Sequence, residues 1–179
     1  MGSIELQVAL DLPDKGRMMH VVSEVADVVD RIEVGTPFIL RYGMSVIADL
    51  RRAIPSAFIV ADCKIMDYGR VTAAVAFESG ADSVIVQASA SRATLEAVCE
   101  AAYKMDRQVM VDGLGFYDTQ VLVRKIQGLP FSHVIIHIAV DEPHINLALL
   151  VAAVAEAKRK NGLPSIAVAG SILPTTCKP

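Results

Sequence analysis

Three charged residues lie close together in the stretch 58–69. Asp62, Lys64 and Asp67 follow an apolar run, residues 58–61, which predicts a buried strand. Side chains alternate along a strand, so Asp62 and Lys64 are expected on the same face. A carboxylate and an ammonium group are costly to take out of water. Their position therefore indicates either a structural ion pair or a site of chemistry.

Four more residues suited to acid–base or metal chemistry lie within or at the ends of predicted strands. They are Asp11, Glu33, Asp112 and His137. Any single one, such as His137, could be a core residue with satisfied hydrogen bonds. Several carboxylates, a lysine and a histidine at one rim need a cation or a substrate to offset their repulsion and desolvation. The set predicts an active site where the ends of parallel strands meet.

Apolar runs that predict strands alternate along the chain with stretches that predict helices. Strands are expected at 6–12, at 31–36, from 58 through Lys64, and at 81–87, 107–112, 133–139 and 165–169. Helices are expected at 15–29, 42–54, 71–79, 91–104, 119–127 and 146–159. Such repeated units predict a parallel sheet with right-handed crossovers. The number of units, and the lack of a Gly-x-Gly-x-x-Gly motif after the first strand, favour one (β/α)-barrel domain spanning 1–179 over a doubly wound sheet.

The composition argues against several classes of partner. The formal net charge is −3 and no basic cluster is present, which argues against nucleic acid. No apolar run is long enough to span a membrane, and the N-terminus lacks a signal-peptide pattern. Cys63, Cys99 and Cys177 have no metal-ligand spacing, so we expect reduced thiols in a cytosolic protein.

Several motifs resemble one family. Asp62-x-Lys64-x-x-Asp67 resembles the Asp-x-Lys-x-x-Asp signature of the orotidine-monophosphate decarboxylase superfamily, and Ala-Leu-Asp ending at Asp11 resembles its first strand. Glu33, in Glu-Val-Gly-Thr-Pro, is similar to the branch that contains 3-hexulose-6-phosphate synthases and 3-keto-L-gulonate-6-phosphate decarboxylases. The sequence Lys-Ile-Met-Asp at 64–67 is more similar to the synthases than to the decarboxylases. The resemblance covers essentially the whole chain and implies a (β/α)8 TIM barrel.

The resemblance implies Mg²⁺-dependent chemistry on a phosphorylated sugar. It assigns Glu33 and Asp62 to Mg²⁺, and Lys64 to a fixed positive charge beside an enediolate of ribulose 5-phosphate. The enediolate then attacks formaldehyde, an aldehyde-lyase reaction run in the direction of synthesis. In the alternative decarboxylase, the enediolate forms by loss of carbon dioxide. A third alternative, of another class, is a non-catalytic barrel that acts as a binding or assembly protein.

The resemblance also assigns a proton carrier and residues that bind the sugar. His137 is the expected proton carrier, because the pKa of histidine lies near neutral pH. Asp11 and Asp67 are expected to hold substrate hydroxyls and to set the geometry of Lys64. In the superfamily the last Asp of the signature reaches into the neighbouring subunit. We therefore expect a homodimer whose active sites lie near the interface.

The C-terminal part departs from the family pattern. Gly170 and Ser171 follow the seventh strand where the family has two glycines of a phosphate loop, so the side chain of Ser171 could crowd a phosphate. Residues 171–179 contain two prolines and make a poor central strand, so we expect these 179 residues to lack strand eight. Either residues of the protein are missing from these 179, or the protein is truncated. The short segment after Asp141 favours missing residues, because that segment borders the same phosphate site.

Overall fold

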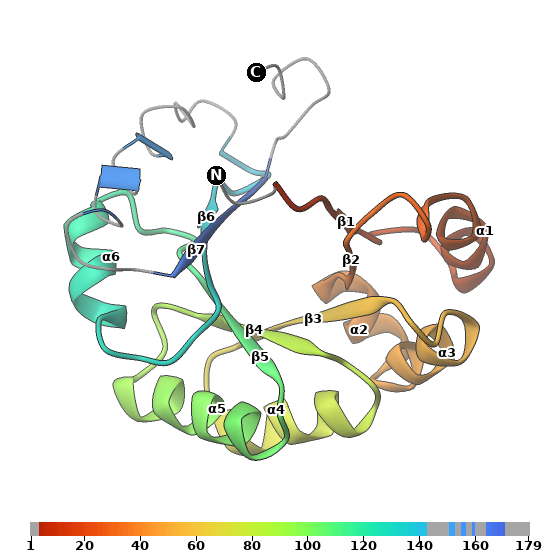
Figure 1. The fold of residues 1–179 in the computed structure, drawn as a ribbon, viewed down its shortest axis with the longest axis horizontal. Helices are drawn as coiled ribbons and strands as arrows, with labels where there is room; N and C mark the ends of the chain where they lie inside the picture. Colours follow the sequence, from red (N-terminus) through yellow and green to blue (C-terminus); the bar gives the residue numbers. More distant parts are fainter. Residues whose placement is uncertain (1–3, 143–150, 153–154, 157–158, 160–163, 171–179) are drawn as a thin grey trace.

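The chain folds into a curled parallel sheet with helices on its outer side. The computed structural model describes residues 4–142, 151–152, 155–156, 159 and 164–170. The seven strands pair in chain order (Figure 1): β1 Gln7–Ala9, β2 Arg31–Val34, β3 Phe58–Ile65, β4 Ser83–Gln87, β5 Gln108–Asp112, β6 His133–His137 and β7 Ser165–Ala169. Every pairing is parallel. The strand-and-helix alternation and the curvature confirm the predicted (β/α)-barrel class.

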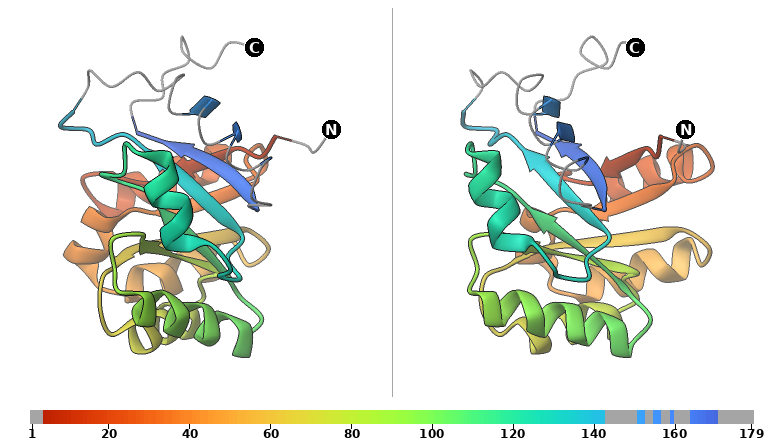
Figure 2. Two further views of the ribbon diagram at one scale, coloured as in Figure 1. Left: turned by 90° about the vertical axis from the view of Figure 1, so that its left-hand side faces the viewer. Right: turned by 60° about the vertical axis from the view of Figure 1, so that its left-hand side comes forward.

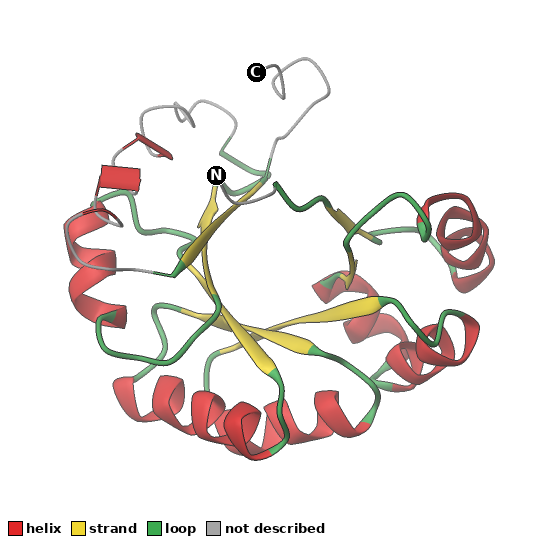
Figure 3. Cartoon of the chain, in the orientation of Figure 1, coloured by secondary structure: helices red, strands yellow, loops and turns green. Residues whose placement is uncertain are grey.

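Six helices are described between the strands: α1 Lys15–Val25, α2 Thr36–Tyr42, α3 Ser45–Ala53, α4 Gly69–Glu78, α5 Arg92–Lys104 and α6 Thr119–Ile126. They lie on the convex side of the sheet (Figures 2 and 3). Three begin at side chains that cap free backbone N–H groups: Asp14 accepts from Arg17 N at 2.8 Å, Ser91 accepts from Thr94 N at 3.0 Å, and Asp118 accepts from Gln120 N at 2.8 Å. No helix in the described ranges is long and apolar enough to cross a membrane.

The region after β2 differs from the prediction. Thr36 begins α2 and does not extend the strand, because Pro37 fits the first helical turn, where its missing N–H costs no hydrogen bond. The helix predicted for 42–54 is α3, and α2 before it was not predicted. The two helices are separated at Gly43, whose φ of +67° belongs to the left-handed region that glycine adopts readily.

Two further predictions fall on residues that the structure does not describe. Most of the predicted helix 146–159 and all of the tail 171–179 lie outside the described ranges, so the prediction that strand eight is missing stays a prediction. Within those ranges β1 and β7 form the two edges of the sheet. Cys63 and Cys99 are free thiols, as expected, and Cys177 lies outside the described residues.

Apolar residues fill both sides of the sheet. The larger cluster lies between strands and helices, and a smaller one in the barrel interior is formed by Val60, Ile85, Met110 and Ile135. Because side chains alternate, the residue two positions further along each of these strands points to the same interior face. Those residues are Asp62, Gln87, Asp112 and His137. The interior packing thus positions one polar side chain at the C-terminal end of each of four adjacent strands.

Candidate active site

A chain of charged contacts crosses the rim from β3 to β6. Lys64 Nζ lies 2.9 Å from Asp62 Oδ2 and 3.5 Å from Asp112 Oδ2. Nδ1 of His137 lies 3.0 and 3.1 Å from the two oxygens of Asp112. Asp62 and Asp112 are only 6% and 1% exposed. The residues that the sequence placed separately at strand ends therefore form one connected group.

The backbone at Lys64 is unusual. Its φ of +40° lies in a region that non-glycine residues rarely adopt, and the β3–β4 register shifts between Ala61 and Ile65. Such a conformation costs roughly 1–3 kcal/mol and persists where the surroundings enforce it. Here the irregular strand end presents the ammonium group to Asp62 and Asp112. A strained residue within a charged group at strand ends fits a functional site better than a purely structural ion pair.

The charges of this group reinforce one another. Burial lowers the pKa of Lys64, but the charge and hydrogen bond of Asp62, with those of Asp112, outweigh it and raise the pKa, so Lys64 stays protonated. Burial raises the pKa of Asp112, but the hydrogen bond from His137 and its electrostatic interaction, the positive charge of Lys64 and the backbone hydrogen bond from Leu114 outweigh it and lower the pKa. Asp112 is therefore an ionised carboxylate that can only accept hydrogen bonds.

A second group of carboxylates lies beside Asp62. Burial, followed by the negative charge of Asp62, raises the pKa of Glu33 to about 7, against the lowering effect of a hydrogen bond from Gln7. Burial and Asp62 also raise the pKa of Asp11, against the opposing charge of Lys64. The carboxylates of β2, β3 and the segment after β1 are thus close enough to repel one another, as predicted for this rim.

Asp62 is held on one side and free on the other. Thr36, at the start of α2, donates its hydroxyl to Asp62 Oδ2 or to the Asp62 carbonyl, at 2.9 and 2.8 Å. Oδ1 of Asp62 is buried and has no hydrogen-bond partner among the described residues. A buried carboxylate oxygen without a donor is costly, and a cation would satisfy it.

Gly170 brings the end of β7 against the end of β6. Its φ is +81°, and a Cβ at this position would lie 1.9 Å from the carbonyl oxygen of Ile138 and 3.2 Å from Cδ2 of His137. Only glycine allows this approach. The predicted substrate-binding residue Gly170 therefore lies next to His137, whereas Ser171 lies outside the described residues.

Asp67 is the predicted site residue that stands apart within this chain. It is exposed on the loop between β3 and α4, and its carboxylate accepts from its neighbour Tyr68 N at 2.8 Å. The described contacts of the Lys64 ammonium are with Asp62 and Asp112. The predicted role of Asp67, including its reach into a neighbouring subunit, stays a prediction.

Two residues of the site were not singled out from the sequence. Gln87 donates from Nε2 to Asp112 Oδ2 at 2.9 Å, and Thr36 contacts Asp62 as described above. Asp112 itself was placed at the rim without a role. The signal for Gln87 was its spacing, because it follows the interior residue Ile85 by two positions, as Asp112 follows Met110.

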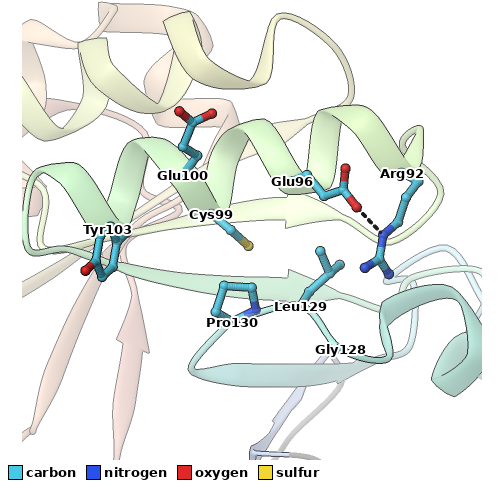
Figure 4. A pocket seen from close by; sticks show the side chains of 8 residues that line it. All are labelled: Arg92, Glu96, Cys99, Glu100, Tyr103, Gly128, Leu129 and Pro130. Atoms are coloured by element: carbon cyan, nitrogen blue, oxygen red, sulfur yellow. Dashed lines mark hydrogen bonds and ion pairs between the residues drawn. The ribbon is translucent and has the colours of Figure 1, made fainter.

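A shallow hollow on the outside of the barrel is separate from this site. It lies between α5 and the turn before β6 (Figure 4), and its lining residues are Arg92, Glu96, Cys99, Glu100, Tyr103, Gly128, Leu129 and Pro130. Arg92 pairs with Glu96 at 2.8 Å. The hollow shares no residue with the strand ends, so we assign it no part in the chemistry.

Within the described ranges, no three or more His, Cys, Asp or Glu side chains are grouped as a metal-binding set. A closed cage of protein ligands is therefore not found in this part of the chain. One or two carboxylates, with water and substrate oxygens completing the shell, are the usual protein contribution to Mg²⁺ binding. Glu33 and Asp62 are suited to that kind of site.

Known proteins resemble this chain over most of its length. The 3-hexulose-6-phosphate synthase of Mycobacterium gastri is 37% identical over 153 residues, which are 84% of this chain and 74% of that protein. The synthase of Bacillus subtilis is 31% identical over 77% of this chain and 66% of its own length.

Solved structures agree with the sequence relatives. The 3-hexulose-6-phosphate synthase from Salmonella typhimurium has a TM-score of 0.81 and 31% identity, covering 94% of this chain and 80% of that one. The 3-keto-L-gulonate-6-phosphate decarboxylase from Vibrio cholerae has a TM-score of 0.75 and 28% identity, covering 96% and 80%. The named relatives thus confirm the predicted class, a lyase related to the synthases. The family model for orotidine 5′-phosphate decarboxylase / HUMPS matches residues 5–168, and the chain belongs to that family.

Proposed function

We propose that this protein is a Mg²⁺-dependent aldehyde-lyase that joins ribulose 5-phosphate and formaldehyde to give a 3-hexulose 6-phosphate. The observation that carries the proposal is the contact chain from Asp62 through Lys64 and Asp112 to His137 at the strand ends. The names of the relatives, 3-hexulose-6-phosphate synthases from several bacteria, support the choice of reaction. The proposed partners are thus a sugar phosphate and formaldehyde.

Two features support a magnesium ion held by Glu33 and Asp62. Asp62 Oδ1 is buried without a hydrogen-bond donor among the described residues, and repulsion from Asp62 contributes to the raised pKa of Glu33. A divalent cation would satisfy the free oxygen of Asp62. Its positive charge would also lower the pKa of Glu33. When bound, it would supply Lewis-acid stabilisation of negative charge on substrate oxygens.

The protein's own groups divide the remaining work. Lys64 stays positively charged and would stabilise the enediolate that forms when a proton leaves carbon 1 of the sugar. His137 is held by Asp112 through Nδ1, which leaves Nε2 to exchange protons. A new carbon–carbon bond then joins carbon 1 to formaldehyde. A proton passes to the former aldehyde oxygen, so the proton lost is replaced and the reaction is a net addition.

We also propose that the protein works as a homodimer with Asp67 acting in the partner's site. Three apolar side chains around Asp67 are exposed in the single chain, Met66 at 51%, Tyr68 at 76% and Val71 at 60%. Exposed apolar side chains beside a predicted functional residue favour an interface at this position. In the single chain Asp67 is directed to its own backbone, so a role in catalysis requires a second subunit.

The proposal is tested by a paired assay. Formaldehyde consumption is measured with ribulose 5-phosphate and Mg²⁺, and carbon dioxide release is measured in parallel with 3-keto-L-gulonate 6-phosphate. We expect formaldehyde consumption to dominate. Carbon dioxide release alone would establish the decarboxylase alternative. Saturable binding of ribulose 5-phosphate without turnover of either substrate would establish the non-catalytic alternative.

A further inference from the structure

Gln87 is the neutral member of the polar group at the rim. It is the last residue of β4 and the register partner of Asp112, the last residue of β5. It is 6% exposed, and its Nε2 donates to Asp112 Oδ2 at 2.9 Å. The backbone fixes the same relationship, because Ala88 N donates to the carbonyl oxygen of Asp112 at 2.8 Å.

Asp112 is shared between two groups of different function. His137 Nδ1 lies within 3.1 Å of both carboxylate oxygens, and Lys64 Nζ lies 3.5 Å from Oδ2. The lysine contact is at the long limit of a hydrogen bond, although an ammonium group attracts a carboxylate more strongly than a neutral imidazole does. Leu114 N anchors Oδ1 at 3.0 Å, and Gln87 anchors Oδ2. Without the amide of Gln87, the only neutral donor left to Oδ2 among the described contacts is His137 Nδ1–H, which is shared with Oδ1, so Oδ2 is less firmly held against rotation toward Lys64.

The orientation of Asp112 decides which nitrogen of His137 carries the proton. An ionised carboxylate only accepts hydrogen bonds, so a neutral His137 must present Nδ1–H to Asp112 and keep Nε2 unprotonated. If Asp112 rotates toward Lys64, the Nδ1–H···Asp112 bond weakens and the other tautomer becomes accessible. That tautomer cannot accept a proton at Nε2.

We propose that Gln87 is a positioning residue of the active site. It holds Asp112 in the orientation that fixes the Nδ1–H tautomer of His137 and keeps Asp112 from pairing fully with Lys64. The effect on catalysis rests on the proposed function, in which His137 carries the proton. The effect on His137 itself does not, because the contacts are made within the free protein.

The test compares two substitutions of glutamine by methionine on the same interior face. Gln87→Met keeps the length of the side chain and removes the donor. Gln108→Met is the matched control, because Gln108 begins β5 and its amide oxygen accepts from Arg31 at 3.3 Å, away from Asp112 and His137. The tautomer of His137 is read from the imidazole ¹⁵N chemical shifts of the free protein, and His137→Gln identifies the signals.

The wild type and Gln108→Met are expected to show His137 as the Nδ1–H tautomer. Gln87→Met is expected to show a mixture of tautomers and a kcat lower by about 10- to 100-fold, the usual effect of losing a supporting hydrogen bond, with little change in KM. Gln87→Asn, which keeps a shorter amide, is expected to lie between them. If Gln87→Met does not fold, the tautomer and kcat are measured in Gln87→Asn in its place.

The two proposals fail in different ways. A wild-type tautomer and a wild-type kcat in a folded Gln87→Met or Gln87→Asn variant would overturn the role of Gln87. If the wild type lacks the proposed activity, the proposed function is overturned. If Gln87→Met still changes the tautomer of His137 in that case, the positioning of His137 by Gln87 is supported.

Discussion

The ammonium group of Lys64 lies 2.9 Å from the carboxylate of Asp62, two positions earlier on a strand whose register shifts between Ala61 and Ile65. The contact leaves one oxygen of Asp62 without a described donor and directs Lys64 toward Asp112 on β5. One pair thus links the proposed metal-binding carboxylates to the proposed proton carrier, His137. The predictions below test the parts of this arrangement separately.

Lys64→Ala is expected to abolish turnover while the protein stays folded. The variant leaves Asp62 and Asp112 without their cation, which costs about 3–5 kcal/mol for a buried pair. Lys64 is part-exposed, and water screens the remaining charges, so we expect a smaller loss of about 1–3 kcal/mol in the free energy of unfolding. Urea unfolding and steady-state kinetics measure both effects.

The control for this variant is Lys104→Ala. Lys104 pairs with Glu100 at 2.7 Å on the exposed face of α5, where water screens the contact and it contributes little to stability. It should leave turnover unchanged. Substantial activity in Lys64→Ala would remove Lys64 from the chemistry.

The stability of the metal-free protein should fall as pH rises toward 7. Glu33 has its pKa raised from 4.5 to about 7, so between these values the folded state binds more protons than the unfolded state. Stability from this group is therefore fully present below pH 4.5 and lost as pH rises through 7. The loss is on the order of 3 kcal/mol.

Urea unfolding at a series of pH values, with a chelator present, measures this dependence. Glu33→Gln should lose it and be more stable than the wild type at pH 8. Glu24→Gln, on the exposed face of α1, should behave as the wild type does. An unchanged pH dependence in Glu33→Gln would contradict the assignment.

Added Mg²⁺ should raise the melting temperature at pH 8, because an ion that binds only the folded state stabilises it. The rise should shrink at pH 5.5, where protons compete with the ion at Glu33. The double variant Glu33→Gln/Asp62→Asn should show no rise. An equal rise in that variant would place the ion elsewhere.

Mixing two inactive variants tests the shared active site. If Asp67 acts in the partner's site, a mixed dimer of Lys64→Ala and Asp67→Ala has one site with both residues intact. Random exchange of subunits should then restore about a quarter of the wild-type activity. Subunit exchange, followed by mass, without any recovery would contradict the reach of Asp67 into the partner.

The sequence predicted the barrel and the strand-end group because both depend on short-range periodicity. Asp62, Asp112 and His137 each follow an interior apolar residue by two positions, and this alternation is visible in the residues themselves. The helix α2 was missed, because the turn geometry at Gly35, Pro37 and Gly43 overrides the apolar pattern there. The roles of Gln87 and Asp112 depend on the register of β4 with β5 and on side-chain rotamers, which the sequence does not display.

The most direct test of the central claim is condensation with labelled formaldehyde. Ribulose 5-phosphate, ¹³C-formaldehyde and Mg²⁺ are incubated with the wild type, and the product is examined by ¹³C NMR. We expect the label in a new carbon–carbon bond at carbon 1 of a 3-hexulose 6-phosphate, and its loss in Lys64→Ala and in excess EDTA. No labelled hexulose phosphate from the folded wild type, or undiminished formation in EDTA, would contradict the account.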